Sequence, residues 1–171
     1  MDVFECIQRR RSIRAYQDRP IPDEALRRIL EAINAAPSAG NLQAYKVFLI
    51  RDAARRRALA EASYNQDYVA QAPVVLVFCT DAARSASKYG RRGERLYCLQ
   101  DATIACAYAQ LAAVALGLGT VWIGAFDDDA VIRALNLPRG LHPVAILPIG
   151  YPDESPAPRP RRALEDLVQE L

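Results

Sequence analysis

The order of hydrophobic patterns in this chain predicts an α+β fold, in which a small sheet is wrapped by helices. Helical patterns come first, and short apolar strands then alternate with further helices. The strands expected at 74–79 and 143–150 are apolar on both faces, which is typical of strands in the middle of a sheet. No repeat divides the 171 residues, so we expect a single domain spanning 1–171.

The first elements follow from local signals. A short helix is predicted at 2–9, and Pro22 with two following acids opens another that ends before Pro37. The compact apolar run 47–50 predicts a strand, and the arginine-rich segment 53–62 predicts a solvated helix.

The segment 94–116 is the longest helical pattern, about 34 Å long at 1.5 Å per residue. It is apolar on almost every side, but polar residues interrupt it, so we do not expect a membrane helix. A helix that is apolar all round must be covered all round. One domain of this size does that poorly, which favours a second subunit against this helix.

The remaining elements are shorter. A strand is expected at 120–124, and Asp127 is expected to cap a helix that runs to Leu135. After the buried strand 143–150, the proline-rich segment 152–160 predicts a connector, and a last short helix is expected from Ala163.

Composition bounds the function classes. The chain is 51% hydrophobic and 25% charged with a net charge of +2, which predicts a globular protein and argues against broad nucleic-acid binding. The four cysteines form no C-x-x-C pair and His142 is the only histidine, so no metal site is expected. An apolar leader is missing from the first residues, and together with the unpaired cysteines this predicts a cytoplasmic protein.

The densest cluster of polar functional groups lies near the start of the chain, in Arg9-Arg10-Arg11-Ser12-Ile13-Arg14-Ala15-Tyr16. It combines four guanidiniums with the hydroxyl of Ser12. Arginine grips phosphate oxygens bidentately, so the cluster suits a doubly charged anion. A basic helix end interacting with its own negative terminus explains the same residues equally well. On spacing alone both interpretations stay open.

Three other segments carry weaker signals. Pro37-Ser38-Ala39-Gly40-Asn41-Leu42-Gln43 allows close backbone approach to a ligand but also reads as an ordinary turn. Asn65-Gln66 could pair with the polar edge of a heterocycle, although a solvated loop amide is the simpler interpretation. Gly124 ends a strand where its N–H could meet a ligand or merely form an exit turn.

Two further patterns, a dinucleotide-binding fingerprint and a hydrolase triad, are not supported by the sequence. The sequence Gly117-Leu118-Gly119 lacks a third glycine and follows a helix, whereas the dinucleotide fingerprint must follow a strand, so it is interpreted as a helix stop. A hydrolase triad of Ser38, Asp101 and His142 has no G-x-S-x-G elbow to support it.

Taken together, these segments resemble the nitroreductase family of flavin mononucleotide (FMN) enzymes over nearly the whole chain. Each motif is modest alone, but their order and spacing are specific. The matching pieces are Arg10-Arg11-Ser12-Ile13-Arg14-Ala15-Tyr16, Ala36-Pro37-Ser38-Ala39-Gly40-Asn41-Leu42-Gln43, Asn65 ahead of Ala72-Pro73-Val74-Val75, Gly117-Leu118-Gly119-Thr120-Val121-Trp122-Ile123-Gly124, and Pro148-Ile149-Gly150-Tyr151-Pro152 leading to Arg159-Pro160-Arg161-Arg162.

The resemblance implies a nitroreductase-like homodimer with a mostly antiparallel sheet, the long helix at the interface and two flavin sites shared between subunits. It assigns the FMN phosphate and ribityl chain to Arg10, Ser12, Arg161 and Arg159, and the ring edge to the Arg11 backbone and to Arg14. It further implies that Pro37, Ser38, Ala39 and Asn41 come from the partner subunit, and that Asn65, Ile123 and Gly124 lie beside the ring.

The implied function is an FMN-dependent oxidoreductase that takes hydride from NADH or NADPH and reduces a nitroaromatic, a quinone or a similar small molecule in a ping-pong cycle. No catalytic residue, nucleic acid or membrane partner is implied. The alternatives are a flavin-binding module without turnover, and a relative with dehalogenating or flavin-fragmenting chemistry. Two departures matter: the segment 81–93 is short and basic, a candidate lid, and Tyr68 stands where some relatives carry lysine.

Overall fold

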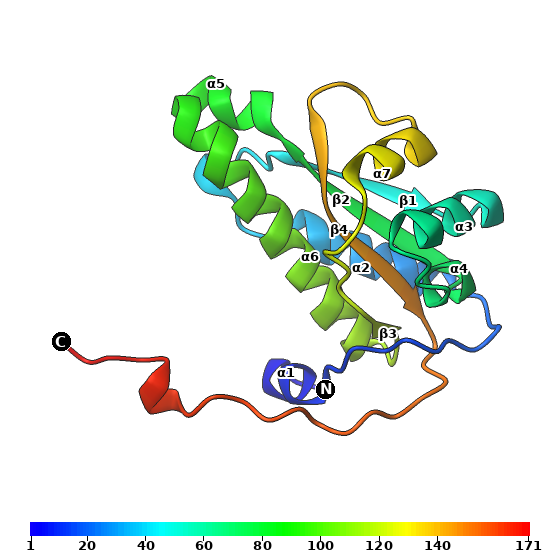
Figure 1. The fold of residues 1–171 in the computed structure, drawn as a ribbon. Coiled ribbons are helices and arrows are strands. Elements are labelled where there is room, and N and C mark those ends of the chain that lie inside the picture. The colour runs from blue at the N-terminus through cyan, green and yellow to red at the C-terminus, as the bar shows by residue number, and fades with distance from the viewer.

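The computed structural model describes residues 1–171 and has three layers, with a sheet between two groups of helices (Figure 1). The strands are β1 (Tyr45–Ile50), β2 (Val74–Asp81), β3 (Gly119–Thr120) and β4 (Leu141–Gly150). They lie in the order β1-β2-β4-β3, and every neighbouring pair is antiparallel. The α+β fold with a small antiparallel sheet flanked by helices is therefore confirmed.

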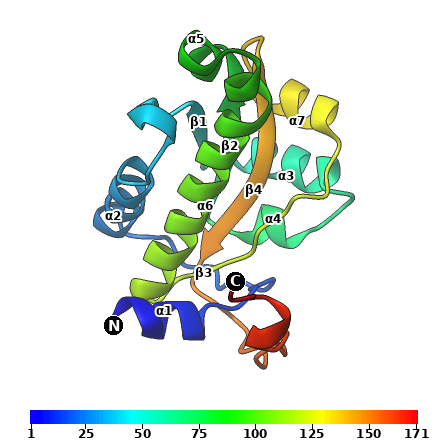
Figure 2. The same ribbon diagram turned by 90° about the vertical axis from the view of Figure 1, so that its left-hand side faces the viewer.

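Seven α-helices and three short helical turns surround this sheet. The α-helices are α1 (Val3–Arg9), α2 (Asp23–Asn34), α3 (Ala53–Ala62), α4 (Tyr68–Gln71), α5 (Ala82–Arg92), α6 (Cys98–Ala115) and α7 (Asp128–Leu135). The turns are η1 (Ala39–Asn41), η2 (Gly93–Tyr97) and η3 (Leu164–Asp166). Helices α2 and α6 cover one face of the sheet, and α3, α4 and α7 lie on the other (Figures 1 and 2).

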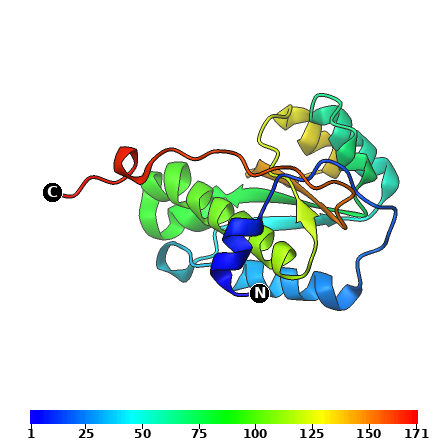
Figure 3. The same ribbon diagram turned by 90° about the horizontal axis from the view of Figure 1, so that it is seen from below.

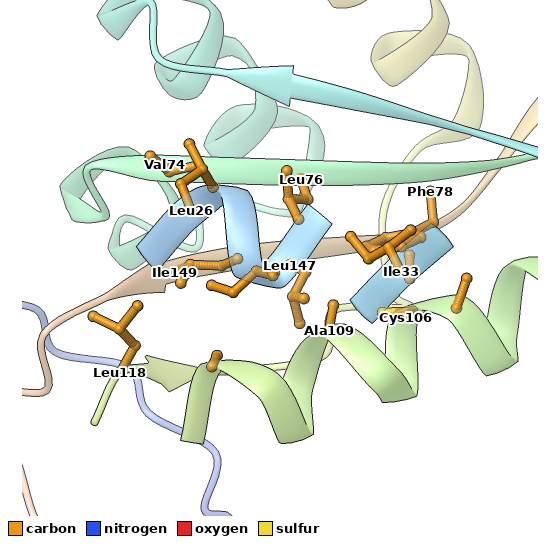
Figure 4. Packing of buried hydrophobic residues seen from close by; sticks show 14 of the residues in the cluster. Leu26, Ile33, Val74, Leu76, Phe78, Cys106, Ala109, Leu118, Leu147 and Ile149 are labelled. Carbon is orange, nitrogen blue, oxygen red and sulfur yellow. The ribbon is translucent and has the colours of Figure 1, made fainter. Parts of the chain in front are cut away.

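Strand β2 explains why two cores form. Its residues alternate between the faces, so Val74, Leu76 and Phe78 pack with α2 and α6, while Val75 and Val77 pack toward α3 and α7. The register adds matching residues of β4 on each face, for example Leu147 opposite Leu76 (Figure 4). As the sequence predicted, this strand is buried on both faces.

The long helix is shorter than predicted. Helix α6 begins at Cys98, and the residues before it form the wider turn η2 after a kink at Gly90. Small buried residues such as Ala105, Cys106 and Ala109 let α6 lie close to the sheet (Figure 4). The rest of α6 is open to solvent, with Leu99 43% and Tyr108 40% exposed about half a turn apart around the helix axis.

Other boundaries also differ from the sequence expectations. The strand expected at 120–124 is reduced to β3 and an isolated bridge between Ile123 and Ile146, because the ladder is interrupted at Val121 and Trp122. The candidate lid 81–93 is a helix, α5, which Asp81 caps by accepting a hydrogen bond from Arg84 N at 3.0 Å.

The two ends of the chain run side by side beneath α6. Helix α1 crosses the end of α6, and the segment 152–171, here called the C-terminal arm, passes below it and leaves the domain (Figures 1 and 3). The last helix expected from Ala163 is only the turn η3, and every residue from Ala157 onward is exposed. None of the helices combines the length and apolarity needed to cross a bilayer.

Candidate functional site

Backbone hydrogen bonds tie the N-terminal segment, residues 10–17, to the sheet and to the C-terminal arm. Ile13 N donates to Thr120 O at 3.0 Å, which places Ser12 beside β3. Gln17 N donates to Tyr151 O and Asp153 N donates to Ala15 O, both at 2.9 Å. These bonds bring together arginines that lie about 150 residues apart in the sequence.

Two buried side chains anchor the N-terminal segment. Ile13 and Tyr16 form a small apolar cluster with Ala72, and the Tyr16 hydroxyl donates to Ile13 O at 2.7 Å. Burial raises the pKa of Tyr16 strongly, so this hydroxyl keeps its proton and remains a donor. The arginines on either side of Ile13 are thereby held at the surface of a fixed segment.

The resulting feature is a groove of about 540 Å³, here called the arginine groove. Five arginines and no acidic residue line it, and proline and alanine of the C-terminal arm form its other wall. Its lining residues are Ile7, Gln8, Arg10, Arg11, Ser12, Arg14, Pro156, Ala157, Pro158, Arg159 and Arg161. Six of the predicted site residues therefore meet in one place.

Arg10 carries the electrostatic signature of this groove. Its pKa is lowered first by burial and then by the positive charges of Arg161 and Arg11. Cations pressed together in this way repel one another, and a bound dianion would relieve the repulsion. The donor set thus fits a phosphate monoester such as the terminal group of FMN.

The other groove arginines are not equivalent. The Arg11 guanidinium turns back onto α1 and donates to Gln8 O at 2.5 Å and to Arg10 O at 2.9 Å. This arrangement caps the helix end, so the helix-end interpretation of the basic cluster is correct for Arg11, while anion binding by the other arginines stays a prediction. Arg14 has an exposed side chain, and its backbone N–H donates to the Glu154 carboxylate.

The predicted residues Pro37, Ser38, Ala39 and Asn41 lie in the segment 37–44, here called the Ser38 loop. It leads from α2 to β1 and contains η1. Ser38 Oγ accepts a hydrogen bond from Gln43 N at 2.9 Å, and Ala39 N donates to Asp101 Oδ1 at 2.9 Å. The loop is therefore fixed to the first turn of α6.

The Ser38 loop and the arginine groove lie at opposite ends of α6. Asp101 is fourteen residues before Ala115, which is about 21 Å along a helix. Ser12 pairs with Thr120, just beyond the other end of α6. The views of Figures 1 and 2 agree, with α5 and the start of α6 far from α1. One chain therefore does not bring these two sets of residues together.

Asn65 lies in the turn between α3 and α4, outside the arginine groove. It is exposed and lines a small surface hollow with Arg57 and Gln71. Tyr64 and Asn65 both have positive φ, 58° and 61°, which residues other than glycine rarely adopt. Tyr68, which follows in α4, packs against the cluster of Ile13 and Tyr16 instead.

Ile123 and Gly124 lie on the strand segment that continues from β3. Ile123 is only 3% exposed and belongs to the core beside α3 and α7. Its backbone exchanges two hydrogen bonds of 3.0 Å with Ile146. The side chain of Ile123 and its backbone N–H and C=O groups are therefore all occupied within the fold, whereas Gly124 is exposed.

Strained backbone marks the same loops that the sequence singled out. Five residues other than glycine have positive φ, and Asn41, Gln43, Tyr64 and Asn65 are four of them. The fifth, Asn136, ends α7 in the usual way. Such conformations cost free energy and cluster at functional sites.

Sequence reasoning missed two residues that shape the site. Asp101 was considered only as a triad member, but its carboxylate binds backbone N–H groups of the Ser38 loop. Gly119 does more than follow a helix stop, because a Cβ there would fall 2.7 Å from the Ile13 side chain. The sequence offered one signal for Asp101, which is a single acidic residue inside an alanine-rich helix. It offered no signal for the close contact at Gly119.

Known proteins match this arrangement over almost the whole chain. A model of the nitroreductase family matches residues 7–66 and 61–151. The chain belongs to the nitroreductase family. Among relatives of this nitroreductase-family chain, a Thermus thermophilus protein named NADH dehydrogenase is 33% identical, over 98% of this chain and 95% of the relative.

Other relatives of this nitroreductase-family chain are longer. A Bacillus subtilis FMN reductase is 36% identical over 94% of this chain but only 70% of its own length. The NADPH:FMN oxidoreductase of Vibrio harveyi, solved in complex with NAD+, has a TM-score of 0.90 at 32% identity. That comparison covers 98% of this chain and 76% of the Vibrio chain.

Proposed function

We propose that this chain is an FMN-dependent oxidoreductase that takes hydride from NADH or NADPH and reduces an electron-poor small molecule. The arginine groove is the observation that carries the proposal, because a groove lined by five arginines and no acidic residue suits a dianion. Family membership and relatives named for FMN and NAD(P)H support the same conclusion.

The phosphate of FMN is assigned to the arginine groove. Arg10 and Arg161, whose charges already influence each other, are the principal ligands, with Arg159 and Ser12 beside them. Two or three charge-assisted contacts contribute roughly 1.5–3 kcal/mol each, enough to retain a cofactor without a covalent bond. Arg11 contributes mainly through its backbone, because its guanidinium already caps α1.

The Ser38 loop is proposed to complete the site from a second copy of the chain. Twofold symmetry with antiparallel α6 helices would bring the loop of one subunit to the arginine groove of the other. This pairing explains why one chain holds the two sets at opposite ends of α6. Pro37, Ser38, Ala39 and Asn41 are then the partner's contribution to each flavin.

Exposed apolar side chains support the homodimer. The exposed surface of α6, helix α1 and the C-terminal arm all present large hydrophobic groups to solvent, which is unusual for a stable monomer. On α6 and α1 they are Leu99, Tyr108, Val3, Phe4 and Ile7, and on the arm Leu164, Leu167, Val168 and Leu171. A second subunit placed along α6 would cover them.

When bound, FMN supplies a ring that accepts a hydride from nicotinamide and passes electrons to the acceptor. Arg14 is assigned to the ring edge, where a cation favours the more negative reduced form. Asn65 and Gly124 are assigned to the same ring, and Ile123, bonded to Ile146, holds the segment that carries Gly124. This chemistry requires no acid or base from the chain. One face of the ring would stay open for nicotinamide and acceptor in turn, which implies a ping-pong cycle.

The visible spectrum of the purified protein tests this function. We expect flavin absorbance that is bleached by NADH or NADPH under anaerobic conditions and restored by a quinone or nitroaromatic. A colourless protein that takes up no added FMN would contradict the proposal. Flavin colour that neither nucleotide bleaches would indicate a binding module without turnover.

A further inference from the structure

Asp101 is a buried carboxylate without a cation. It is only 2% exposed, and the ion pairs of this chain, Arg27 with Glu24 and Arg51 with Asp23, do not include it. A charge in such a place is costly unless hydrogen bonds compensate it. Its position on α6 therefore needs a reason other than helix formation.

That compensation comes from the backbone of the Ser38 loop. Asp101 Oδ1 accepts from Ala39 N at 2.9 Å, and Oδ2 accepts from Ala44 N at 3.2 Å. One carboxylate thus spans the loop from its beginning to its end. Ala44 is fully buried, so its N–H would have no water to bind if the carboxylate were lost.

The loop between these two anchors is strained. Gly40, Asn41 and Gln43 all have positive φ, at 57°, 56° and 48°, and two of them are not glycine. Such a backbone persists only where its surroundings hold it. From the outside, α5 adds a further contact, in which Arg84 donates to Leu42 O.

A neighbouring tyrosine fixes the same region. Tyr45, the residue after the loop, donates from its hydroxyl to Ile33 O at 2.8 Å and so joins the end of α2 to the start of β1. Burial and the charge of Asp101 raise the pKa of Tyr45, which keeps this donor protonated.

We propose that Asp101 is a positioning residue, which holds the Ser38 loop in its strained conformation so that the loop can contact the flavin bound to the partner subunit. The inference rests on the function proposed above. Asp101 lies two residues from the exposed Leu99 on the same helix, so the carboxylate connects the expected dimer helix to the expected cofactor loop.

The test compares FMN with riboflavin, which lacks the phosphate, in the full-length protein carrying Asp101→Asn. The amide side chain keeps one acceptor but turns N–H groups toward a backbone N–H. We expect both flavins to bind roughly tenfold more weakly, since one charge-assisted bond is lost. The ratio of the two dissociation constants should stay unchanged, because the arginine groove is intact.

Asp52→Ala is the matched control. Asp52 also binds a backbone N–H, from Arg55 at 2.9 Å, but it caps α3 away from the Ser38 loop. Its loss should lower the melting temperature while leaving both dissociation constants at their wild-type values. A general loss of stability is thereby separated from loss of loop geometry.

Amide hydrogen exchange gives the second readout. In Asp101→Asn, the amides of Ala39 and Ala44 should exchange faster while those of β2 do not change. Should the variant fail to fold, slow exchange of both amides in the flavin-free wild type supports the proposal, and fast exchange overturns it.

Two failures can be told apart. If the wild type binds FMN, and Asp101→Asn binds FMN and riboflavin each as tightly as the wild type does, the positioning role is wrong and the proposed function stands. If the wild type binds no FMN, the proposed function itself fails, and this inference with it.

Discussion

Arg10 acquires its role from residues that are distant in the sequence. By sequence it is one arginine in a basic run, and a helix end explains that run as well as a ligand does. The fold places Arg161 close enough to lower its pKa and turns the neighbouring Arg11 back to cap α1. Which arginine caps the helix and which remains free for a ligand depends on side-chain direction, which sequence spacing cannot predict.

Arg10→Ala should weaken FMN binding about 10- to 100-fold, since it removes roughly 1.5–3 kcal/mol of charge-assisted hydrogen bonding. Arg161→Ala should act similarly, and neither should alter riboflavin binding. Fluorescence titration of each variant measures both constants. Arg27→Ala is the control, because Arg27 pairs only with Glu24 on the surface of α2. Unchanged FMN binding in both groove variants would show that the phosphate lies elsewhere.

Cys79 and Cys106 are fully buried, and burial raises the pKa of Cys79 to about 12. Because the thiolate is the reactive form, a raised pKa predicts that the native protein leaves both thiols unmodified by an aromatic disulfide reagent at pH 8. All four cysteines should react in denaturant. Mass spectrometry identifies the modified residues, and rapid native labelling of either buried thiol would contradict the predicted core.

At the scale of elements, the sequence predicted those with strong local signals. The span of α3 matches the prediction, and β2 was correctly placed at the centre of the sheet. Helices α4 and α5 were not predicted, since α4 is a single turn and α5 is polar with a kink at Gly90. Strand β3 is short because its ladder with β4 is interrupted after Thr120, and its other edge pairs with the N-terminal segment, a tertiary contact.

Gly119→Ala should destabilise the protein by about 1–3 kcal/mol, because the new Cβ would overlap the branched side chain of Ile13. Ile13→Ala adds room at the same place, so the double variant should be more stable than the sum of the single changes predicts. Urea denaturation measures the three free energies of unfolding. Strict additivity would show that the two residues are not in contact.

At the scale of the whole molecule, the sequence predicted a partner subunit from a helix that is apolar on almost every side. The structure covers one side of α6 and leaves Leu99 and Tyr108 exposed. The sequence could not show that the two halves of the candidate site lie at opposite ends of this helix. That separation follows from topology, and it is the strongest geometric argument for a shared site.

Leu99→Asp combined with Tyr108→Asp should convert a dimer into a folded monomer that has lost FMN. The charges would be buried in the proposed interface but solvated in a monomer. Sedimentation and flavin absorbance are the measurements. Leu49→Asp, at a similarly exposed leucine of β1, should leave the dimer intact. A double variant that stays dimeric and yellow would place the interface elsewhere.

The central claim is that the arginine groove binds the phosphate of a flavin. The most direct measurement is the ratio of the dissociation constants of riboflavin and FMN for the wild-type protein. Two arginine contacts to a dianion predict that FMN binds at least about a hundredfold more tightly. Equal affinity for the two flavins would contradict the claim.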